Sequence, residues 1–296
     1  MLQDTIRPWI EATRPKTLPA AVIPVLVGTA LAYEAGVVHW VPVLACLLFA
    51  LLVQVGANFA NDYADFEKGA DTAARLGPRR AVASGAISVA AMRRGTFVVL
   101  VLAFACGMIL VWWRGWELLP VGLLSLLFAW AYTGGPYPLA YHGLGDVFVF
   151  LFFGLVAVCG TYYVLVGKLT LFVLDAAVPV GLLATNILVV NNCRDIVTDE
   201  RAGKHTLVVR YGRQFGRRQY GVVLAVAAAV PIIVGVYRER YWLAAASVVL
   251  LAGIPLWRTL CATRDGDVLN GVLARTAGLL LVFGVVWAGL LAFARG

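Results

Sequence analysis

Charged residues are scarce in this chain of 296 residues. They account for 14% of the positions, whereas hydrophobic residues account for 61% and the mean hydropathy is +0.86. Soluble domains ordinarily contain about 25% charged residues, so this composition excludes an ordinary water-soluble protein. We therefore predict a polytopic membrane protein.

Cysteine is also rare, and strand-like patterns are missing. The five Cys residues form no Cys-x-x-Cys pair, so we predict neither a disulfide framework nor a zinc site. The chain has no series of short segments in which polar and apolar residues alternate, which excludes a transmembrane β-barrel. Helices remain as the elements that cross the membrane.

The long apolar segments have the length that a membrane span requires. The hydrocarbon core of a bilayer is about 30 Å thick and needs about 20 helical residues. No linker rich in Pro or Ser interrupts the segments, so we expect one membrane domain over residues 1–296. We predict an all-α polytopic membrane protein with about nine spans near 17–35, 41–61, 95–113, 116–133, 146–167, 171–192, 219–237, 241–260 and 275–294.

Basic residues are distributed unevenly between the two sides of these predicted spans. Lys and Arg accumulate in cytoplasmic loops, so the side that holds most of the 24 basic residues is predicted to face the cytoplasm. This places the N-terminus on the cytoplasmic side of the cell membrane and the C-terminus on the opposite side. The net charge of +8 needs no nucleic-acid partner, because no basic groove with interleaved aromatic residues is present. The outer side holds only Arg114, Lys168, Arg238, Arg240 and Arg295.

Two short polar runs interrupt the apolar sequence, each at the cytoplasmic end of a predicted span. The first extends from Asn58 through Asp65 to Asp71, and the second extends from Asn191 to Asp199. Charge close to lipid is costly, so a functional role is the default interpretation. The repeated arrangement suggests two related halves that face one cavity.

The spacing within each run places its polar side chains on one helix face. Residues three, four or seven positions apart project in the same direction from an α-helix. Hard oxygen ligands of this kind are typical of Mg²⁺, which commonly bridges carboxylates to phosphates. The alternative, that these residues only solvate the interface or cap a helix, is less favoured because two runs match. The stripes are Asn58, Asp62 and Asp65, with Asn61 four before Asp65, and Asn191 or Asn192, Asp195 and Asp199.

Basic residues follow both runs. Most of them are explained by the positive-inside rule alone. We select Arg80 and Lys204 as the exceptions that could neutralise phosphate charge left over by a metal ion.

These segments resemble a known family. The sequence Asn-Asp-Tyr-Ala-Asp at 61–65, the Asp195-x-x-x-Asp199 run and the many spans resemble the UbiA-type intramembrane prenyltransferases over essentially the whole chain. Residues 134–146, 191–195 and 203–207 are most similar to the menaquinone-pathway branch, which acts on 1,4-dihydroxy-2-naphthoate.

The resemblance implies a helical bundle around a central cavity, capped by cytoplasmic loops. It also implies a Mg²⁺-dependent enzyme that transfers a polyprenyl group from polyprenyl diphosphate to 1,4-dihydroxy-2-naphthoate. Loss of the carboxylate would give demethylmenaquinol, CO₂ and diphosphate. The implied metal ligands are Asn61, Asp62, Asp65, Asp195 and Asp199, with Asp71 as a weaker one because Gly69 stands where the common motif has Asp. Expected substrate contacts are Asn58, Asn61, Arg80, Asn191, Asn192, Lys204 and Tyr137, and expected catalytic residues are Asp65, Asp195, Arg80, Lys204, Tyr137 and Tyr141.

A second departure from the family concerns the loop after Tyr137. The ubiquinone-type branch carries Lys four residues after the corresponding Tyr, whereas this chain has Tyr141. The loop is therefore expected to lack a cation and to favour a different aromatic acceptor. A sister enzyme that uses an acceptor such as 4-hydroxybenzoate stays open, and so does a cation-coupled transporter, although the acids cluster at span ends on one side. Donor chain length and oligomeric state are not predicted.

Overall fold

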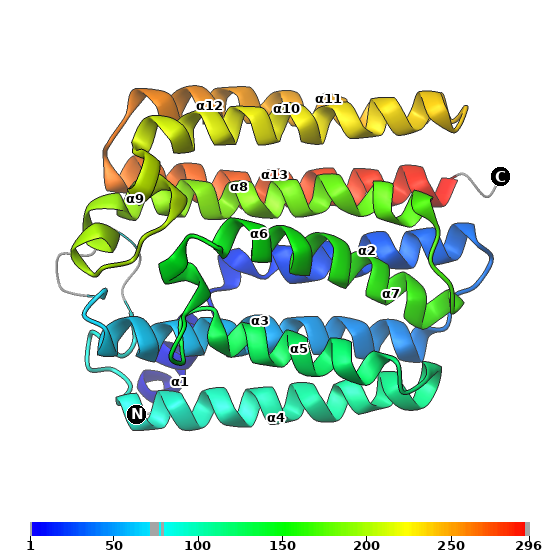
Figure 1. Cartoon of the computed structure of the whole chain (residues 1–296). Coiled ribbons are helices and arrows are strands. Elements are labelled where there is room, and N and C mark those ends of the chain that lie inside the picture. The colour runs from blue at the N-terminus through cyan, green and yellow to red at the C-terminus, as the bar shows by residue number, and fades with distance from the viewer. Residues whose placement is uncertain (1, 72–76, 78–79, 294–296) are drawn as a thin grey trace.

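The computed structural model describes residues 2–71, 77 and 80–293, and this part of the chain forms helices and no strands (Figure 1). The predicted all-α membrane fold is confirmed. The last predicted span, 275–294, ends one residue beyond the described part, and Arg295 also lies outside that part. The helices are α1 (Leu2–Ala12), α2 (Pro19–Glu34), α3 (Trp40–Glu67), α4 (Val89–Arg114), α5 (Leu118–Ala131), α6 (Gly145–Val149), α7 (Ala157–Val166), α8 (Leu171–Arg201), α9 (Leu207–Tyr211), α10 (Arg213–Tyr237), α11 (Ala246–Val249), α12 (Gly253–Ala262) and α13 (Gly266–Phe293). Short turns complete the set: η1 (Pro15–Thr17), η2 (Leu139–His142), η4 (Tyr241–Ala245), η5 (Leu250–Ala252) and the π-helical η3 (Phe150–Val156), which joins α6 to α7.

The predicted count of nine spans is not confirmed. Seven helical segments of the described chain are long and apolar enough to cross a membrane, or up to eight if a bent pair counts as one span. That pair, Ile6–Thr17 and Pro19–Glu34, bends by 53° where Pro15 and Pro19 interrupt the helix. The other shortfall is α5, which has 14 residues and ends before the Gly-Gly-Pro turn at 134–136.

The long helices lie side by side with their axes roughly parallel (Figure 1). One side of the bundle contains α3, α4 and α5, and the other contains α8, α10, α12 and α13, with α2 and the α6–α7 segment between them. The largest apolar core joins α2, α7, α8, α10 and α13. Large apolar side chains also cover the outside, including Phe97, Trp112 and Val222, and a lipid environment explains this exposure.

Small residues allow the centre of the bundle to pack closely. A Cβ atom on Gly181 of α8 would lie 2.8 Å from the Phe150 carbonyl oxygen and 2.9 Å from the Gly154 Cα. Close approach of helix backbones through small residues is the usual way in which membrane helices associate. The contact fixes η3 against the middle of α8.

Both polar runs lie at the same end of the bundle. The α3 helix has 28 residues and α8 has 31, so each continues beyond its apolar part and carries its acidic residues on its last turns. The same end contains α1 and α9, whereas α13 finishes at the opposite end (Figure 1). The fold therefore brings two segments more than 100 positions apart into one polar region.

Candidate functional site

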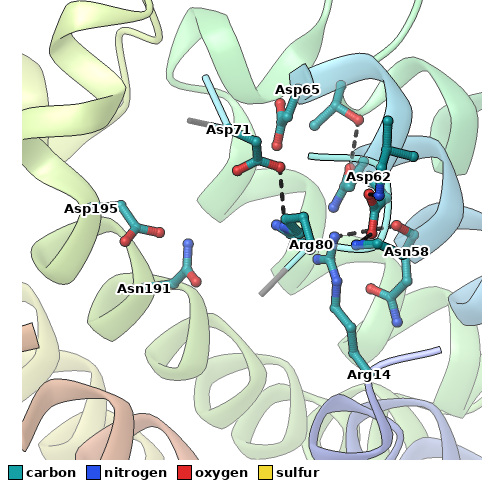
Figure 2. A network of polar contacts seen from close by, with 12 residues as sticks. Arg14, Asn58, Asp62, Asp65, Asp71, Arg80, Asn191 and Asp195 are labelled. Atoms are coloured by element: carbon teal, nitrogen blue, oxygen red, sulfur yellow. Dashed lines mark hydrogen bonds and ion pairs between the residues drawn. The ribbon is translucent and has the colours of Figure 1, made fainter. Parts of the chain in front are cut away.

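A polar cavity of about 440 Å³ lies between the ends of α3 and α8. In Figure 2, Asp195 and Asn191 project from α8 toward Arg80, Asp71 and Asp65 on the other side. The cavity brings together most of the residues singled out by the sequence. Those that line it are Asn61, Asp62, Asp65, Arg80, Asn191, Asn192, Asp195, Asp199 and Lys204.

Asp62 and Asn61 attach the neighbouring loops to α3. The two carboxylate oxygens of Asp62 accept hydrogen bonds from the backbone N–H groups of Ala81 and Val82, at 3.2 and 3.0 Å. The Asn61 side-chain oxygen accepts a hydrogen bond of 2.5 Å from the Thr133 hydroxyl. Asp62 thus positions the loop that presents Arg80 to the cavity.

Asp65 is held by groups from two other parts of the chain. The Tyr141 hydroxyl donates a hydrogen bond of 2.9 Å to it, and the Lys204 ammonium lies 3.8 Å away. The same ammonium lies 3.9 Å from Asp199. Burial and the nearby charge of Asp65 raise the pKa of the Tyr141 hydroxyl, so this group stays protonated and donates. Lys204 is therefore a cation shared by the two acidic runs.

Asp195 forms a buried ion pair with its neighbour in sequence. Arg194 Nε and Nη2 donate to the two carboxylate oxygens at 2.7 and 2.6 Å. The same guanidinium donates to Asn191 at 2.7 Å and to Asn270 of α13 at 2.8 Å. These contacts orient the Asp195 side chain and tie α13 to the site.

Asp71 and Asn58, both predicted from the sequence, lie beside the polar cavity and do not line it. Arg80 forms an ion pair with Asp71 (Figure 2), with Nε 3.1 Å from the carboxylate. Asp71 is 3% exposed. The cavity is lined by Arg80 but not by Asp71. Asn58 donates a hydrogen bond of 2.8 Å to the Thr13 carbonyl oxygen, and its own carbonyl accepts one from Arg14. Asn58 thus anchors the segment after α1 and lines an adjoining apolar pocket rather than the polar cavity.

The structure does not bring Tyr137 to the cavity. Its side chain is 57% exposed and stacks on His142, with ring centroids 3.7 Å apart. The turn between Pro136 and Pro138 directs the ring outward. Tyr137 therefore does not reach the cavity, although it is only four residues from Tyr141 in the sequence.

Lys68 was missed by sequence reasoning. Its ammonium lies 4.6 Å from the centre of the Tyr141 ring and donates a hydrogen bond of 2.5 Å to the Thr133 carbonyl oxygen. The loop that was expected to lack a cation therefore receives one from the end of α3. Burial lowers the pKa of Lys68, partly offset by the attraction of Asp65. The only signal in the sequence was its place three residues after Asp65.

Arg14 and Arg194 also line the cavity without having been predicted. Arg194 stands inside the second run, directly before Asp195. Arg14 comes from the N-terminal segment, and only the folded chain shows that this segment returns to the end of α3.

The donor set of the cavity fits Mg²⁺. In the described residues no three His, Cys, Asp or Glu side chains already converge in a metal-binding arrangement. The oxygen-rich lining nevertheless suits a hard cation, because carboxylates and amides reach the cavity from both helices. The position of Lys204 between Asp65 and Asp199 shows that the two runs are close enough to share one cation.

An apolar pocket of about 290 Å³ adjoins the polar cavity. Its walls come from α2, α3, α4, α5 and the α6–α7 segment, and are almost entirely hydrophobic. The two spaces lie directly beside each other and share five lining residues, which are Gln54, Asn61, Tyr132, Val149 and Phe153. The site can therefore accept a molecule with an anionic head and a long apolar tail.

Known proteins resemble this chain in sequence and in fold. The 1,4-dihydroxy-2-naphthoate octaprenyltransferase of Mycobacterium tuberculosis is 37% identical over 97% of each chain. The protein of the same name from Haemophilus influenzae is 38% identical over 82% of this chain and 81% of its own. A UbiA homolog from Archaeoglobus fulgidus bound to DMAPP and Mg²⁺ shares the fold, with a TM-score of 0.67 and 14% identity over 95% of this chain and 99% of that one.

The family assignment follows from the match of the sequence to a whole protein family. The UbiA prenyltransferase family matches residues 21–271, which include both acidic runs and most of the residues that line the two pockets. The chain is thus an integral membrane protein that belongs to the UbiA prenyltransferase family.

Proposed function

We propose that this protein transfers a polyprenyl group from polyprenyl diphosphate to 1,4-dihydroxy-2-naphthoate in menaquinone biosynthesis. The observation that carries the proposal is the junction of an acidic, cation-containing cavity with an apolar pocket, which matches a diphosphate joined to a hydrocarbon chain. The names of the relatives from M. tuberculosis and H. influenzae support the naphthoate acceptor.

The two acidic runs would hold Mg²⁺ in this reaction. The residues assigned to the ion are Asn61, Asp62 and Asp65 on α3 and Asp195 and Asp199 on α8, with Asp71 as an outer contributor. When bound, the ion neutralises part of the diphosphate charge and makes it a better leaving group. Hydrogen bonds from the surrounding loops keep the carboxylates oriented for this task.

Arg80 and Lys204 are assigned to the remaining phosphate charge. Both line the cavity, and each is now paired with an acid, so an incoming diphosphate would exchange a carboxylate partner for a phosphate partner. Asn191 and Asn192 add polar side chains along α8. Together these groups stabilise negative charge where the allylic C–O bond breaks.

The aromatic ring of Tyr141 lies beside the cavity and contacts two cations. Its hydroxyl fixes Asp65, and the Lys68 and Lys204 ammonium groups lie 4.6 and 5.5 Å from the ring centre. The polyprenyl chain would occupy the adjoining apolar pocket, which excludes water from the reacting carbon.

The reaction balances with these components alone. The allylic C–O bond breaks and its electron pair leaves with diphosphate. The electron-rich naphthoate ring then forms the new C–C bond, and loss of its carboxylate as CO₂ returns an electron pair to the ring. We place the reaction at the cytoplasmic face of the cell membrane, with the N-terminus inside, because basic residues concentrate at this end of the bundle.

Product formation by the purified protein tests the proposal. The protein in nanodiscs would receive octaprenyl diphosphate, Mg²⁺ and 1,4-dihydroxy-2-naphthoate under anaerobic conditions, with 4-hydroxybenzoate in a parallel reaction. We expect a prenylated, decarboxylated naphthoquinol by mass spectrometry, and none when EDTA replaces Mg²⁺. Product from hydroxybenzoate alone would move the protein to a sister branch, and no product from either acceptor would reject the proposal.

The aspartate variants Asp65→Asn and Asp195→Asn probe the assigned site. We expect each to lose transfer by at least about 100-fold, since each removes a charge that faces the diphosphate. Asp175→Asn is the matched control, because Asp175 lies on α8 near the opposite end of that helix. Activity of Asp65→Asn at the level of the control would remove Asp65 from the site.

A further inference from the structure

Asp146 is a buried carboxylate in the cavity that the binding of diphosphate does not use. It lies at the start of α6, is 7% exposed and lines the polar cavity. Asp65 and Asp195 each lie beside a basic side chain, but Asp146 has no ion-pair partner among the residues that the structure describes. Its single side-chain partner there is Gln219 of α10, whose Nε2 donates a hydrogen bond of 3.0 Å. A buried carboxylate without a cation is costly, which calls for a functional explanation.

Two further polar groups stand beside this carboxylate. The Oε1 atom of Gln219 is buried and has no hydrogen-bond partner within the described chain. The Tyr132 hydroxyl reaches the residue before Asp146, because a Cβ atom on Gly145 would lie 2.9 Å from it. Tyr132 lines both the polar cavity and the apolar pocket. These groups form a small polar patch with unused hydrogen-bonding capacity.

The wall around the patch is apolar and lies where the two pockets join. Val149 and Phe153, which follow Asp146 on the same helical segment, line both spaces. Leu188 of α8 also lines the cavity, and its Cδ2 atom would lie 3.3 Å from a Cβ on Gly145. A flat, apolar molecule with a hydrogen-bond donor on its rim fits such a wall. A polyprenyl chain has no polar group for the patch, and diphosphate would be repelled by Asp146.

We infer that Asp146, with Tyr132 and Gln219, binds a phenolic hydroxyl of the aromatic acceptor. This inference rests on the proposed function and adds to it the place and orientation of the acceptor. The hydroxyl donates to the Asp146 carboxylate, a charge-assisted hydrogen bond that increases electron density in the ring. The acceptor carboxylate, which Asp146 repels, points instead toward the basic side chains of the cavity.

Steady-state kinetics of Asp146→Asn test the assignment. Asparagine keeps the size of the side chain and an oxygen for the Gln219 hydrogen bond, but removes the charge that faces the hydroxyl. We expect the KM for 1,4-dihydroxy-2-naphthoate to rise by about 10- to 100-fold, the usual effect of losing a hydrogen bond to a charged group. The KM for polyprenyl diphosphate should change less than about twofold. Asp175→Asn is again the matched control.

Inhibitors that lack one hydroxyl show whether the contact is direct. We would measure the inhibition constants of 1-hydroxy-2-naphthoate and 4-hydroxy-2-naphthoate against the natural protein and against Asp146→Asn. If Asp146 contacts a hydroxyl, the inhibitor without that hydroxyl should bind both proteins almost equally, whereas the other should bind the variant about 10-fold or more weakly. Equal weakening of both inhibitors would overturn the assignment, because a general structural defect does not distinguish them.

Tyr132→Phe provides a second variant that removes a single oxygen atom. It should raise the KM for the acceptor and leave the KM for the donor unchanged. If Asp146→Asn does not fold, this variant alone tests whether the patch binds the acceptor. An unchanged acceptor KM in Tyr132→Phe and in any folded Asp146→Asn would reject the inference while the proposed function stands. Failure of the natural protein to prenylate the naphthoate would reject both.

Discussion

The Arg194 guanidinium should be a major source of stability at the polar end of the bundle. Its side chain is 2% exposed and that of Asp195 is 6% exposed, and the two are joined by a bidentate ion pair. Arg194→Met keeps an apolar chain of similar length but removes every one of the hydrogen bonds to Asp195, Asn191 and Asn270. Asp195 then loses the guanidinium that binds both of its carboxylate oxygens.

The loss can be estimated from the cost of breaking a buried pair. Removal of one partner typically costs about 3–5 kcal/mol, and we expect the lower value, about 3 kcal/mol, because the cavity admits water. Arg93→Met is the matched control, since the Arg93 and Glu67 side chains are 59% and 41% exposed. That exposed pair should contribute less than about 1 kcal/mol.

Reversible unfolding of the purified protein in mixed micelles with increasing SDS, followed by far-UV circular dichroism, measures these free energies. The double variant Arg194→Met/Asp195→Asn should lose about 2 kcal/mol less than the sum of the single variants, because it removes both charges of the pair together. The reasoning is refuted if Arg194→Met loses no more than the Arg93 control, or if the two changes at 194 and 195 are additive.

Three further predictions concern the site and the packing that supports it. Tyr141→Phe removes the hydrogen bond to Asp65 and should lower kcat about 10-fold, measured as diphosphate released per second, and an unchanged kcat would contradict the role of that bond. Lys204→Met removes the cation shared by the acidic runs and should raise the KM for polyprenyl diphosphate at least about 10-fold, an effect that a merely stabilising lysine would not produce. Gly181→Ala forces a Cβ atom against η3 and should destabilise the protein by about 1–3 kcal/mol in the SDS titration, whereas Gly289→Ala, which meets open space, should change it by less than about 0.5 kcal/mol.

The fold class and the acidic runs could be predicted because both depend on short-range patterns. Hydropathy over about 20 residues identifies a span, and helical spacing places Asp62 and Asp65 together. The number of spans was harder, because α2 and α5 are shortened by breaks at proline and glycine that hydropathy does not register. Length and composition alone therefore gave the class of fold and not its exact count.

Contacts between distant segments account for what the sequence did not predict. Lys68 stands over Tyr141, Arg194 reaches Asn270 of α13, and Asp146 is joined to Gln219, and none of these pairs has a recognisable spacing along the chain. The position of Tyr137 depended on the direction of one turn. Helical periodicity identifies which residues share a face, but the neighbours of that face are decided by tertiary packing.

The π-helical turn η3 has a consequence for how this segment tolerates insertions and deletions. It lies between Asp146 at the start of α6 and the part of α7 that lines the apolar pocket, so it sets the angle between the two. Each residue of an α-helix turns the chain by about 100°. The wide turn takes up one extra residue, so deleting one residue between 150 and 156 would restore ordinary winding and leave the orientation of α7 relative to Asp146 nearly unchanged. Ordinary winding of the segment at its present length would instead rotate α7 by about that angle. The wide turn therefore keeps the register between the polar cavity and the apolar pocket, with Gly154 against Gly181.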